Sequence, residues 1–186
     1  MLSVFRTGSI TLKTQTYKTN LHMEEQQKKY RLLFVCLGNI CRSPAAEEIM
    51  RQVVMCGGDE SEYALDSAGL YGGHAGASPD SRMRAHAARR GYLLRHKARR
   101  VEEKDFDRFD YIFAMDDSNY DALRRMAPTV EDVRKVRRMT EFLQHYVSDS
   151  VPDPYYGGAS GFENVLNLLE DACEGVYKKL KNGGRL

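Results

Sequence analysis

The sequence has no apolar run long enough to span a membrane, so it predicts no transmembrane helix. Cysteine is scarce, and the four residues form no dense framework of the kind that disulfide-rich secreted domains carry (Cys36, Cys41, Cys56, Cys173). No apolar secretory signal precedes them. We therefore expect a cytoplasmic protein in a reducing compartment, with no membrane partner.

A strong excess of either charge is also missing. The net charge of +2 gives the chain no overall attraction to nucleic acid. Residues 82–100 hold eight Lys or Arg and no acid, but residues 102–121 hold eight acids, and Tyr92 is the only aromatic residue in the basic part. We interpret both segments as solvated, partly paired helix faces, and we expect no nucleic-acid partner.

Acidic residues are absent from residues 1–22, which are rich in threonine. We predict that residues 1–29 are an N-terminal extension outside the fold. This extension is a disordered tail, an upstream start read in error with Met23 as the true start, or a segment that is not native to the protein. A transit peptide is a further alternative. The remaining residues, 30–186, are long enough to form one domain with a substantial core.

From Tyr30 onward, segments typical of strands and helices alternate along the chain. We expect strands at 31–36, 63–67, 111–115 and 133–136, and helices at 44–56, 79–90, 102–108, 116–126 and 162–180. This alternation predicts an α/β fold with three α/β/α layers and a central, mostly four-stranded parallel sheet. Ligands bind such sheets at the carboxyl ends of the strands, where Cys36 falls.

Residues 32–46, LLFVCLGNICRSPAA, combine a buried strand, a tight loop and a helix start. The apolar run ends at Cys36, and Gly38 and Asn39 tolerate the positive φ of a tight loop. Ser43 is predicted to be the N-cap of the helix, with a proline at its first position. Because loop amides and the positive helix end would face one spot, the stretch predicts a phosphate-binding loop after the first strand.

A cysteine and an arginine stand at the two ends of this loop. The thiolate of Cys36 would be stabilised by the loop amides, the helix end and Arg42, and the same groups would hold a phosphate dianion. Arg42 offers two parallel donors to two phosphoryl oxygens, which lysine does not. Ser43 either caps the helix or turns its hydroxyl toward the sulfur. The loop therefore predicts a thiolate placed against a bound phosphate.

Attack of sulfur on a phosphoryl group requires that the leaving oxygen be protonated. Asp153 is the candidate acid, because it lies between two prolines in a stiff loop with two tyrosines beside it. An aspartate in a loop most often serves turn chemistry, so the residues alone leave both roles open.

Four motifs, taken together, resemble the low molecular weight protein tyrosine phosphatase family. They are CLGNICRSP at 36–44, DSAG at 66–69, AMDDSN at 114–119 and DPYYG at 153–157. The resemblance runs from about Arg31 to the final helix. It implies hydrolysis of phosphotyrosine in proteins and peptides and of small aryl phosphates, with inorganic phosphate as product. It implies no cofactor and no metal, and we expect a monomer or weak dimer.

The resemblance also implies residue roles. Cys36 would form a phosphocysteine intermediate, Arg42 would hold the phosphate and stabilise the transition state, and Asp153 would protonate the phenolate and then activate water. The implied substrate-binding residues are Leu37, Gly38, Asn39, Ile40, Cys41, Ser43, Tyr155 and Tyr156.

Three further properties follow from the resemblance alone. Asn39, Ser67 and His96 match a network that fixes the shape of the loop. Cys41 matches a residue that forms a reversible disulfide with Cys36 under oxidation. The tyrosine pair at 155–156 matches aromatics at the pocket mouth that can be phosphorylated.

The sequence departs from the family at one wall of the pocket. The family usually carries an aromatic residue at the position that Gly73 occupies here. Tyr71 and His74 are the candidates to replace it. If neither does, the pocket is more open than in the family.

Several alternative functions compete with this interpretation. Thioredoxin-coupled arsenate reductases have a similar loop but need further cysteines, and Cys56 and Cys173 lie in no Cys-rich redox segment. Protein arginine phosphatases carry threonine where this chain has Ile40, and they lack the tyrosine pair. A phosphopeptide-binding module would need no acid. A zinc site at Cys36 and Cys41 lacks a matching ligand pair nearby.

Overall fold

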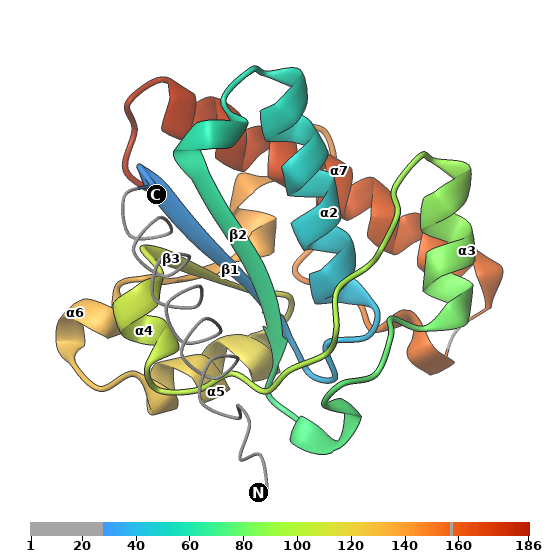
Figure 1. Ribbon diagram of the computed structural model, residues 1–186, viewed down its shortest axis with the longest axis horizontal. Helices are drawn as coiled ribbons and strands as arrows, with labels where there is room; N and C mark the ends of the chain where they lie inside the picture. The colour runs from blue at the N-terminus through green and yellow to red at the C-terminus, as the bar shows by residue number, and fades with distance from the viewer. Residues whose placement is uncertain (1–27, 157) are drawn as a thin grey trace, which may run out of the picture.

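The computed structural model describes residues 28–156 and 158–186 (Figure 1). Four parallel strands form one sheet in the order β2-β1-β3-β4. The strands are β1 Tyr30–Cys36, β2 Tyr63–Gly69, β3 Tyr111–Ala114 and β4 Val136–Arg138. The predicted α/β class and four-stranded parallel sheet are confirmed. All but the last two residues of the predicted extension, 1–29, lie outside the described residues.

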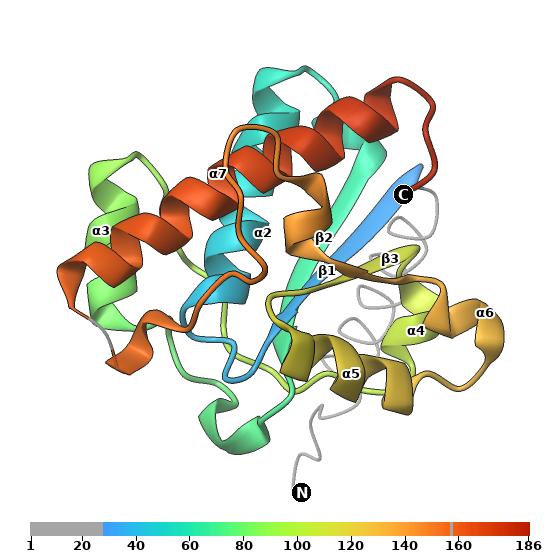
Figure 2. The same cartoon turned by 180° about the vertical axis from the view of Figure 1, so that it is seen from behind.

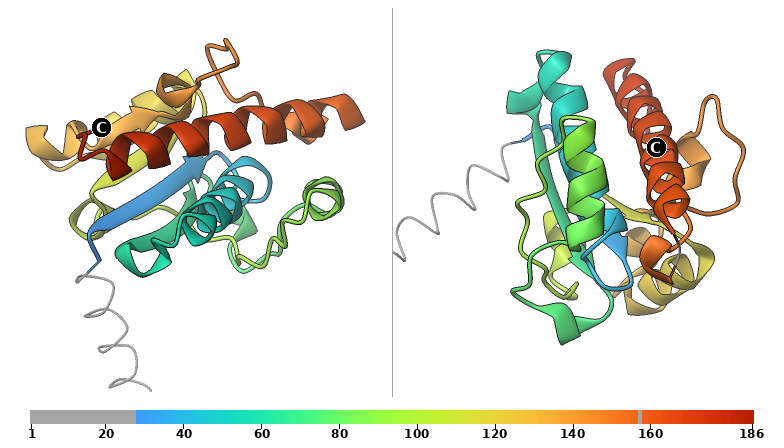
Figure 3. Two further views of the ribbon diagram at one scale, coloured as in Figure 1. Left: turned by 90° about the horizontal axis from the view of Figure 1, so that it is seen from above. Right: turned by 90° about the vertical axis from the view of Figure 1, so that its right-hand side faces the viewer.

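Helices cover both faces of the sheet (Figures 2 and 3). The helices that share one hydrophobic core are α2 Arg42–Cys56, α3 Ser81–Arg89 and α7 Ala159–Lys181. The opposite core takes residues from α4 Asp105–Arg108 and α5 Asp117–Met126, and α6 Val130–Val133 follows α5. No helix among the described residues is long and apolar enough to cross a membrane.

The first strand is apolar on both sides because it lies between these two cores. Leu32 and Phe34 belong to the core under α2 and α7, whereas Leu33 and Val35 belong to the core under α4 and α5. All four side chains are fully buried. Successive strand residues point to opposite faces, so a central parallel strand must be apolar at every position rather than at alternate ones.

The predicted start of the helix at 44–56 was wrong. α2 begins at Arg42 rather than at residue 44, its N-cap position is Cys41, and no side chain caps it. The side chain of Ser43 is engaged elsewhere, because its Oγ lies 3.1 Å from Sγ of Cys36. Of the two roles left open for Ser43, it therefore takes the position beside the sulfur.

The predicted fourth strand, 133–136, was also misplaced. Thr129 starts a short helix there, since its Oγ1 accepts the N–H of Asp132 and donates to the carboxylate of the same residue. The strand begins only at Val136, after this helix ends. Elsewhere the predicted elements are present with shifted ends: β2 continues to Gly69, α3 begins at Ser81, and α7 extends over 159–181.

Candidate active site

The phosphate loop, residues 36–43, joins the carboxyl end of β1 to α2. It turns at Asn39, the one non-glycine residue with positive φ (53°) in the described part of the chain. Asparagine adopts this left-handed conformation more readily than most residues. A Cβ on Gly69, at the end of β2, would lie 3.0 Å from backbone atoms of Gly38 and Asn39. Glycine at position 69 therefore lets the second strand approach the loop closely.

Cys36 lies at the base of this loop and is only 2% exposed. Its Sγ accepts the backbone N–H of Asn39 at 3.3 Å, and the hydroxyl of Ser43 lies 3.1 Å away. Ser43 is itself held by a hydrogen bond from Nδ2 of Asn39. The loop amide of Asn39 and the Ser43 side chain therefore converge on the sulfur of Cys36.

Arg42 is buried at the first position of α2 and contacts three oxygens. Its Nη1 donates to Oδ2 of Asp116 at 2.6 Å and to the carbonyl of Val151 at 3.2 Å, and its Nη2 donates to Oδ2 of Asp153 at 2.7 Å. Burial opposes the charge, but Cys36 and the two carboxylates outweigh it and raise the pKa of Arg42. Arg42 therefore remains a cation deep in the site, and a guanidinium can offer parallel donors to an anion.

The three predicted catalytic residues, Cys36, Arg42 and Asp153, line one cavity of about 430 Å³. Asp153 arrives from a loop 111 residues after Arg42, and its side chain is 38% exposed. Its Oδ1 accepts the N–H of Tyr155 at 3.1 Å, which fixes the carboxylate. Further predicted residues line the same cavity: Leu37, Gly38, Ile40, Cys41 and Tyr155. The side chain of Tyr156 lies outside the described residues.

Cys41 shares this cavity with Cys36, and both are free thiols. Burial raises the pKa of the Cys41 thiol, and the nearby carboxylate of Asp80 acts in the same direction. Cys41 therefore stays protonated near neutral pH, which makes it a poor nucleophile. The disulfide between them stays a prediction.

The wall of the cavity near Gly73 is formed by Tyr71 and His74. Both side chains line the cavity, and their rings meet edge to face at 5.5 Å between centroids. A Cβ on Gly73 would lie 2.2 Å from Cζ and Oη of Tyr71. The ring of Tyr71 thus fills the space that a side chain at position 73 would occupy, while His74 lies 3.2 Å from a Cβ built on Gly38.

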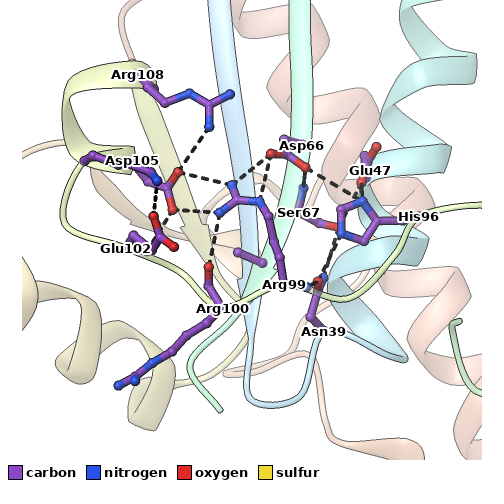
Figure 4. A network of polar contacts seen from close by, with 12 residues as sticks. Asn39, Glu47, Asp66, Ser67, His96, Arg99, Arg100, Glu102, Asp105 and Arg108 are labelled. Atoms are coloured by element: carbon purple, nitrogen blue, oxygen red, sulfur yellow. Dashed lines mark hydrogen bonds and ion pairs between the residues drawn. The ribbon is translucent and has the colours of Figure 1, made fainter. Parts of the chain in front are cut away.

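The side-chain amide of Asn39 is held at all four of its hydrogen-bonding positions, and Figure 4 shows it beside Ser67, His96 and Arg99. Its Nδ2 donates to the hydroxyls of Ser43 at 2.9 Å and Ser67 at 3.0 Å. Its Oδ1 accepts the Nε2–H of His96 at 3.1 Å and the backbone N–H of Arg99 at 2.9 Å. The structure therefore brings together Asn39, Ser67 and His96, the residues predicted to support the loop.

Two carboxylates face the other ring nitrogen of His96. Nδ1 lies 3.0 Å from Oε2 of Glu47 and 3.7 Å from Oδ1 of Asp66. Burial opposes the charge of Glu47, but hydrogen bonds from His96 and Ser67 outweigh it and lower the pKa of Glu47. Among the described residues, Glu47, Asp66 and His96 are the group that could offer ligand atoms to a metal. Because these atoms already bond to one another and to Arg99, the cluster is better described as an ion-pair network.

Asp116 begins the predicted helix at 116–126, and its side chain has a second contact that the sequence does not predict. Its Oδ1 accepts the N–H of Asn119 at 2.7 Å, while Oδ2 holds Arg42. The signal was present, because Asp116 follows β3, which pairs with β1 and ends at the same edge of the sheet. Glu47 and Arg99 carry no comparable signal, since one looks like a helix-surface acid and the other like part of a basic run.

A thiol and a buried arginine cation that share one anion-binding loop, with a carboxyl group opposite, are typical of a phosphatase that uses a cysteine. Comparison with known proteins gives the family. The model of the low molecular weight phosphotyrosine protein phosphatases matches residues 31–185. The chain belongs to this family.

The matched region spans nearly the whole length of the relatives. A low molecular weight protein-tyrosine-phosphatase from Streptomyces coelicolor is 44% identical over 154 residues, which are 82% of this chain and 94% of the relative. The crystal structure of a protein tyrosine phosphatase from Entamoeba histolytica matches with a TM-score of 0.81 and 47% identity, over 83% of this chain and 98% of that one. An arginine phosphatase from Drosophila matches with a TM-score of 0.75 and 33% identity, over 81% and 97%.

Proposed function

We propose that this protein-tyrosine-phosphatase hydrolyses phosphotyrosine in proteins and peptides, and small aryl phosphates, through a cysteinyl-phosphate intermediate. The observation that carries the proposal is that Cys36, Arg42 and Asp153 line one cavity. A phosphopeptide-binding module would need the loop and Arg42 but no acid. The position of Asp153 in the same cavity therefore favours catalysis over binding alone.

In the first step, the sulfur of Cys36 attacks phosphorus while the bond from phosphorus to the phenolic oxygen breaks. Asp153, in its protonated form, gives its proton to that leaving oxygen. Arg42 and the loop amides hold the nonbridging oxygens, whose charge is spread over the transition state. The products of this step are the phenol and a phosphorylated Cys36.

In the second step, water attacks the same phosphorus and the phosphorus–sulfur bond breaks. The carboxylate of Asp153 accepts the proton of the attacking water, which returns it to its acid form. Inorganic phosphate leaves, and Cys36 is again a thiolate that the N–H of Asn39 and the Ser43 hydroxyl can stabilise.

The side chains that line the cavity favour a substrate with an aromatic ring. Tyr71, His74 and Tyr155 line it, and aromatic side chains pack well against the flat ring of a phenyl phosphate. Ile40, at the position where arginine phosphatases carry threonine, also lines it. These side chains support phosphotyrosine as the substrate, although a Drosophila arginine phosphatase is among the relatives.

The decisive experiment is turnover of p-nitrophenyl phosphate in EDTA by the wild type and by Cys36→Ser. We expect turnover by the wild type and a loss of at least about 10³-fold in the variant. Full activity of Cys36→Ser, or none in the wild type, would remove the proposal. Phosphotyrosine and phosphoarginine peptides are compared in the same assay, and a preference for phosphoarginine would assign the substrate to that related class. Arsenate reduction with thioredoxin tests the remaining enzymatic alternative.

We also infer a cytoplasmic location and a monomer or weak dimer. All four cysteines are free thiols, and the proposed nucleophile works only while Cys36 is reduced. A reducing compartment suits this requirement. The partners are then phosphotyrosine proteins or peptides.

A further inference from the structure

Arg99 lies in the extended segment that follows α3, and its backbone joins two parts of the site. Its N–H donates to Oδ1 of Asn39 at 2.9 Å, and its carbonyl accepts the N–H of Gly69 at 2.9 Å. The segment thus connects the phosphate loop to the end of β2. The backbone of Arg99 is a direct partner of the residue at which the loop turns.

The guanidinium of Arg99 bridges two carboxylates (Figure 4). Nε and Nη2 donate to Oδ2 of Asp66 at 3.0 and 2.8 Å, while Nη1 and Nη2 donate to Asp105 at 2.9 and 3.2 Å. The second Nη1 proton goes to the carbonyl of Arg100 at 3.2 Å. All five N–H donors of the group are therefore engaged, which lysine with three donors would not reproduce.

The carboxylates that Arg99 contacts are shielded from water, fully at Asp105 and partly at Asp66. Asp105 is fully buried, and it also accepts the N–H of Glu102 at 2.9 Å. Asp66 is 26% exposed and lies near the carboxylate of Glu47, so its charge needs a compensating cation. Burial raises the pKa of Asp66, Glu47 adds to this, and Arg99 acts in the opposite direction. The guanidinium thus fixes Asp66 and favours its charged form.

Asp66 provides a second connection between Arg99 and the phosphate loop. Its Oδ1 lies 3.7 Å from Nδ1 of His96, whose Nε2–H is bonded to Oδ1 of Asn39. We propose that Arg99 is a positioning residue for the phosphate loop, acting on the Asn39 amide directly through its backbone N–H and indirectly through Asp66 and His96. The inference rests on the proposed function in one respect, which is that the loop binds a phosphate group.

The test compares Arg99 with Arg31, an arginine of similar exposure far from the loop. Arg31 pairs with both oxygens of Asp110 at the opposite end of β1, and its side chain is 22% exposed against 27% for Arg99. Inorganic phosphate is the probe, and its affinity is measured by calorimetry on each full-length variant beside thermal unfolding. Arg99→Gln should weaken phosphate affinity by about tenfold and Arg99→Lys by about threefold.

The matched variants Arg31→Gln and Arg31→Lys should lower the unfolding temperature but leave phosphate affinity within about twofold. A double variant, Arg99→Gln with Asp66→Asn, should lose less affinity than the product of the two single losses, because both act on Asn39 through one path. Equal losses in the Arg99 and Arg31 variants, or an unchanged affinity in Arg99→Lys and Asp66→Asn, would assign Arg99 to fold stability alone and overturn the inference.

These readouts separate the inference from the proposed function. A wild type that binds phosphate but turns over no aryl phosphate would remove the proposed function and leave the role of Arg99 intact. Normal turnover of aryl phosphate, together with a phosphate affinity that is unchanged in the Arg99 variants, would remove the inference about Arg99 and leave the proposed function intact.

Discussion

Arg42 and Asp153 are joined by an ion pair, with Nη2 lying 2.7 Å from Oδ2. The proposed mechanism gives these side chains different tasks, since Arg42 holds the phosphoryl oxygens and Asp153 protonates the leaving oxygen. In this structure the two side chains are bound to each other. A substrate dianion must therefore compete with the carboxylate of Asp153 for the same guanidinium.

Replacing Asp153 with asparagine should separate these two effects. We expect inorganic phosphate to inhibit Asp153→Asn several-fold more tightly, because a competing negative charge beside Arg42 is gone. We also expect kcat to fall, and to fall further as the leaving group becomes more basic, because the variant has no proton to give. The measurement is a series of aryl phosphates with graded leaving-group pKa. A loss that is the same for every member would show that Asp153 is not the acid.

Asp116 should matter through its contact with Arg42. In Asp116→Asn the amide oxygen can still cap α5, but the charged acceptor at 2.6 Å from Nη1 is lost. Because a hydrogen bond to a charged group is worth about 1.5–3 kcal/mol, we expect kcat/KM to fall by about tenfold or more. Asp117→Asn is the control, since Asp117 is 70% exposed and pairs with Arg138. If both variants behave like the wild type, the ion pair does not position Arg42.

Tyr71 and Gly73 should behave as one unit. A side chain at position 73 would displace the Tyr71 ring, since a Cβ there lies 2.2 Å from it. We expect Tyr71→Ala and Gly73→Ala each to lower kcat/KM for a phosphotyrosine peptide by about threefold to tenfold. The double variant should lose no more than either single variant, because the same ring contact is removed.

The matched control for this pair is Gly72→Ala. The nearest atoms to its Cβ belong to the flexible Arg100 side chain, at 3.3 Å from Cδ, so activity should stay near that of the wild type. Additive losses from Tyr71→Ala and Gly73→Ala would mean that Gly73 does not act by making room for the ring.

Asp171, on α7, holds the loop that leads to Asp153. Its buried carboxylate accepts the backbone N–H groups of Gln144, His145 and Tyr146, and it lies 2.7 Å from Nδ1 of the His145 ring. Burial opposes the charge, but these hydrogen bonds outweigh it and lower the pKa of Asp171 to about 2. Unfolded aspartate has a pKa of about 3.9.

Because the folded pKa lies below the unfolded one, Asp171 should stabilise the fold fully above about pH 4 and lose this effect as the pH falls toward 2. Asp171→Asn should lower the free energy of unfolding by roughly 2 kcal/mol at pH 7. The difference from the wild type should shrink toward zero near pH 2. Urea unfolding over this pH range is the measurement, with Asp149→Asn, an exposed position in the same loop, as the control. A gap that does not change with pH would contradict this account.

The sheet and most helices could be predicted because their signals are local. The run 32–35 is apolar at every position, and Asp116 precedes a helix as a capping residue. Predictions failed where a side chain serves two partners. The sequence around Ser43 predicts a helix cap, but the hydroxyl of Ser43 lies against the sulfur of Cys36 instead. The segment after Thr129 forms a helix where a strand was expected.

The residues of the site also fall into those that the sequence predicts and those that it does not. Cys36, Arg42 and Asp153 could be named because their motifs are contiguous in the sequence. The contacts of Asp116 with Arg42 and of Arg99 with Asn39 could not, because each depends on how distant segments meet at one edge of the sheet. Gly73 marks a missing side chain, but only the three-dimensional placement of Tyr71 reveals what fills the gap.

The left-handed turn at Asn39 limits how this loop could be used in protein engineering. Residues 36–43 contain only part of the contacts that hold their shape. Besides Ser43, the side chain of Asn39 bonds to Ser67, His96 and Arg99, which follow it by 28, 57 and 60 residues. A graft of CLGNICRS onto a foreign strand and helix would carry the cysteine and the arginine but would bury an amide without those partners. The smallest transplantable unit therefore runs from the loop through the segment after α3.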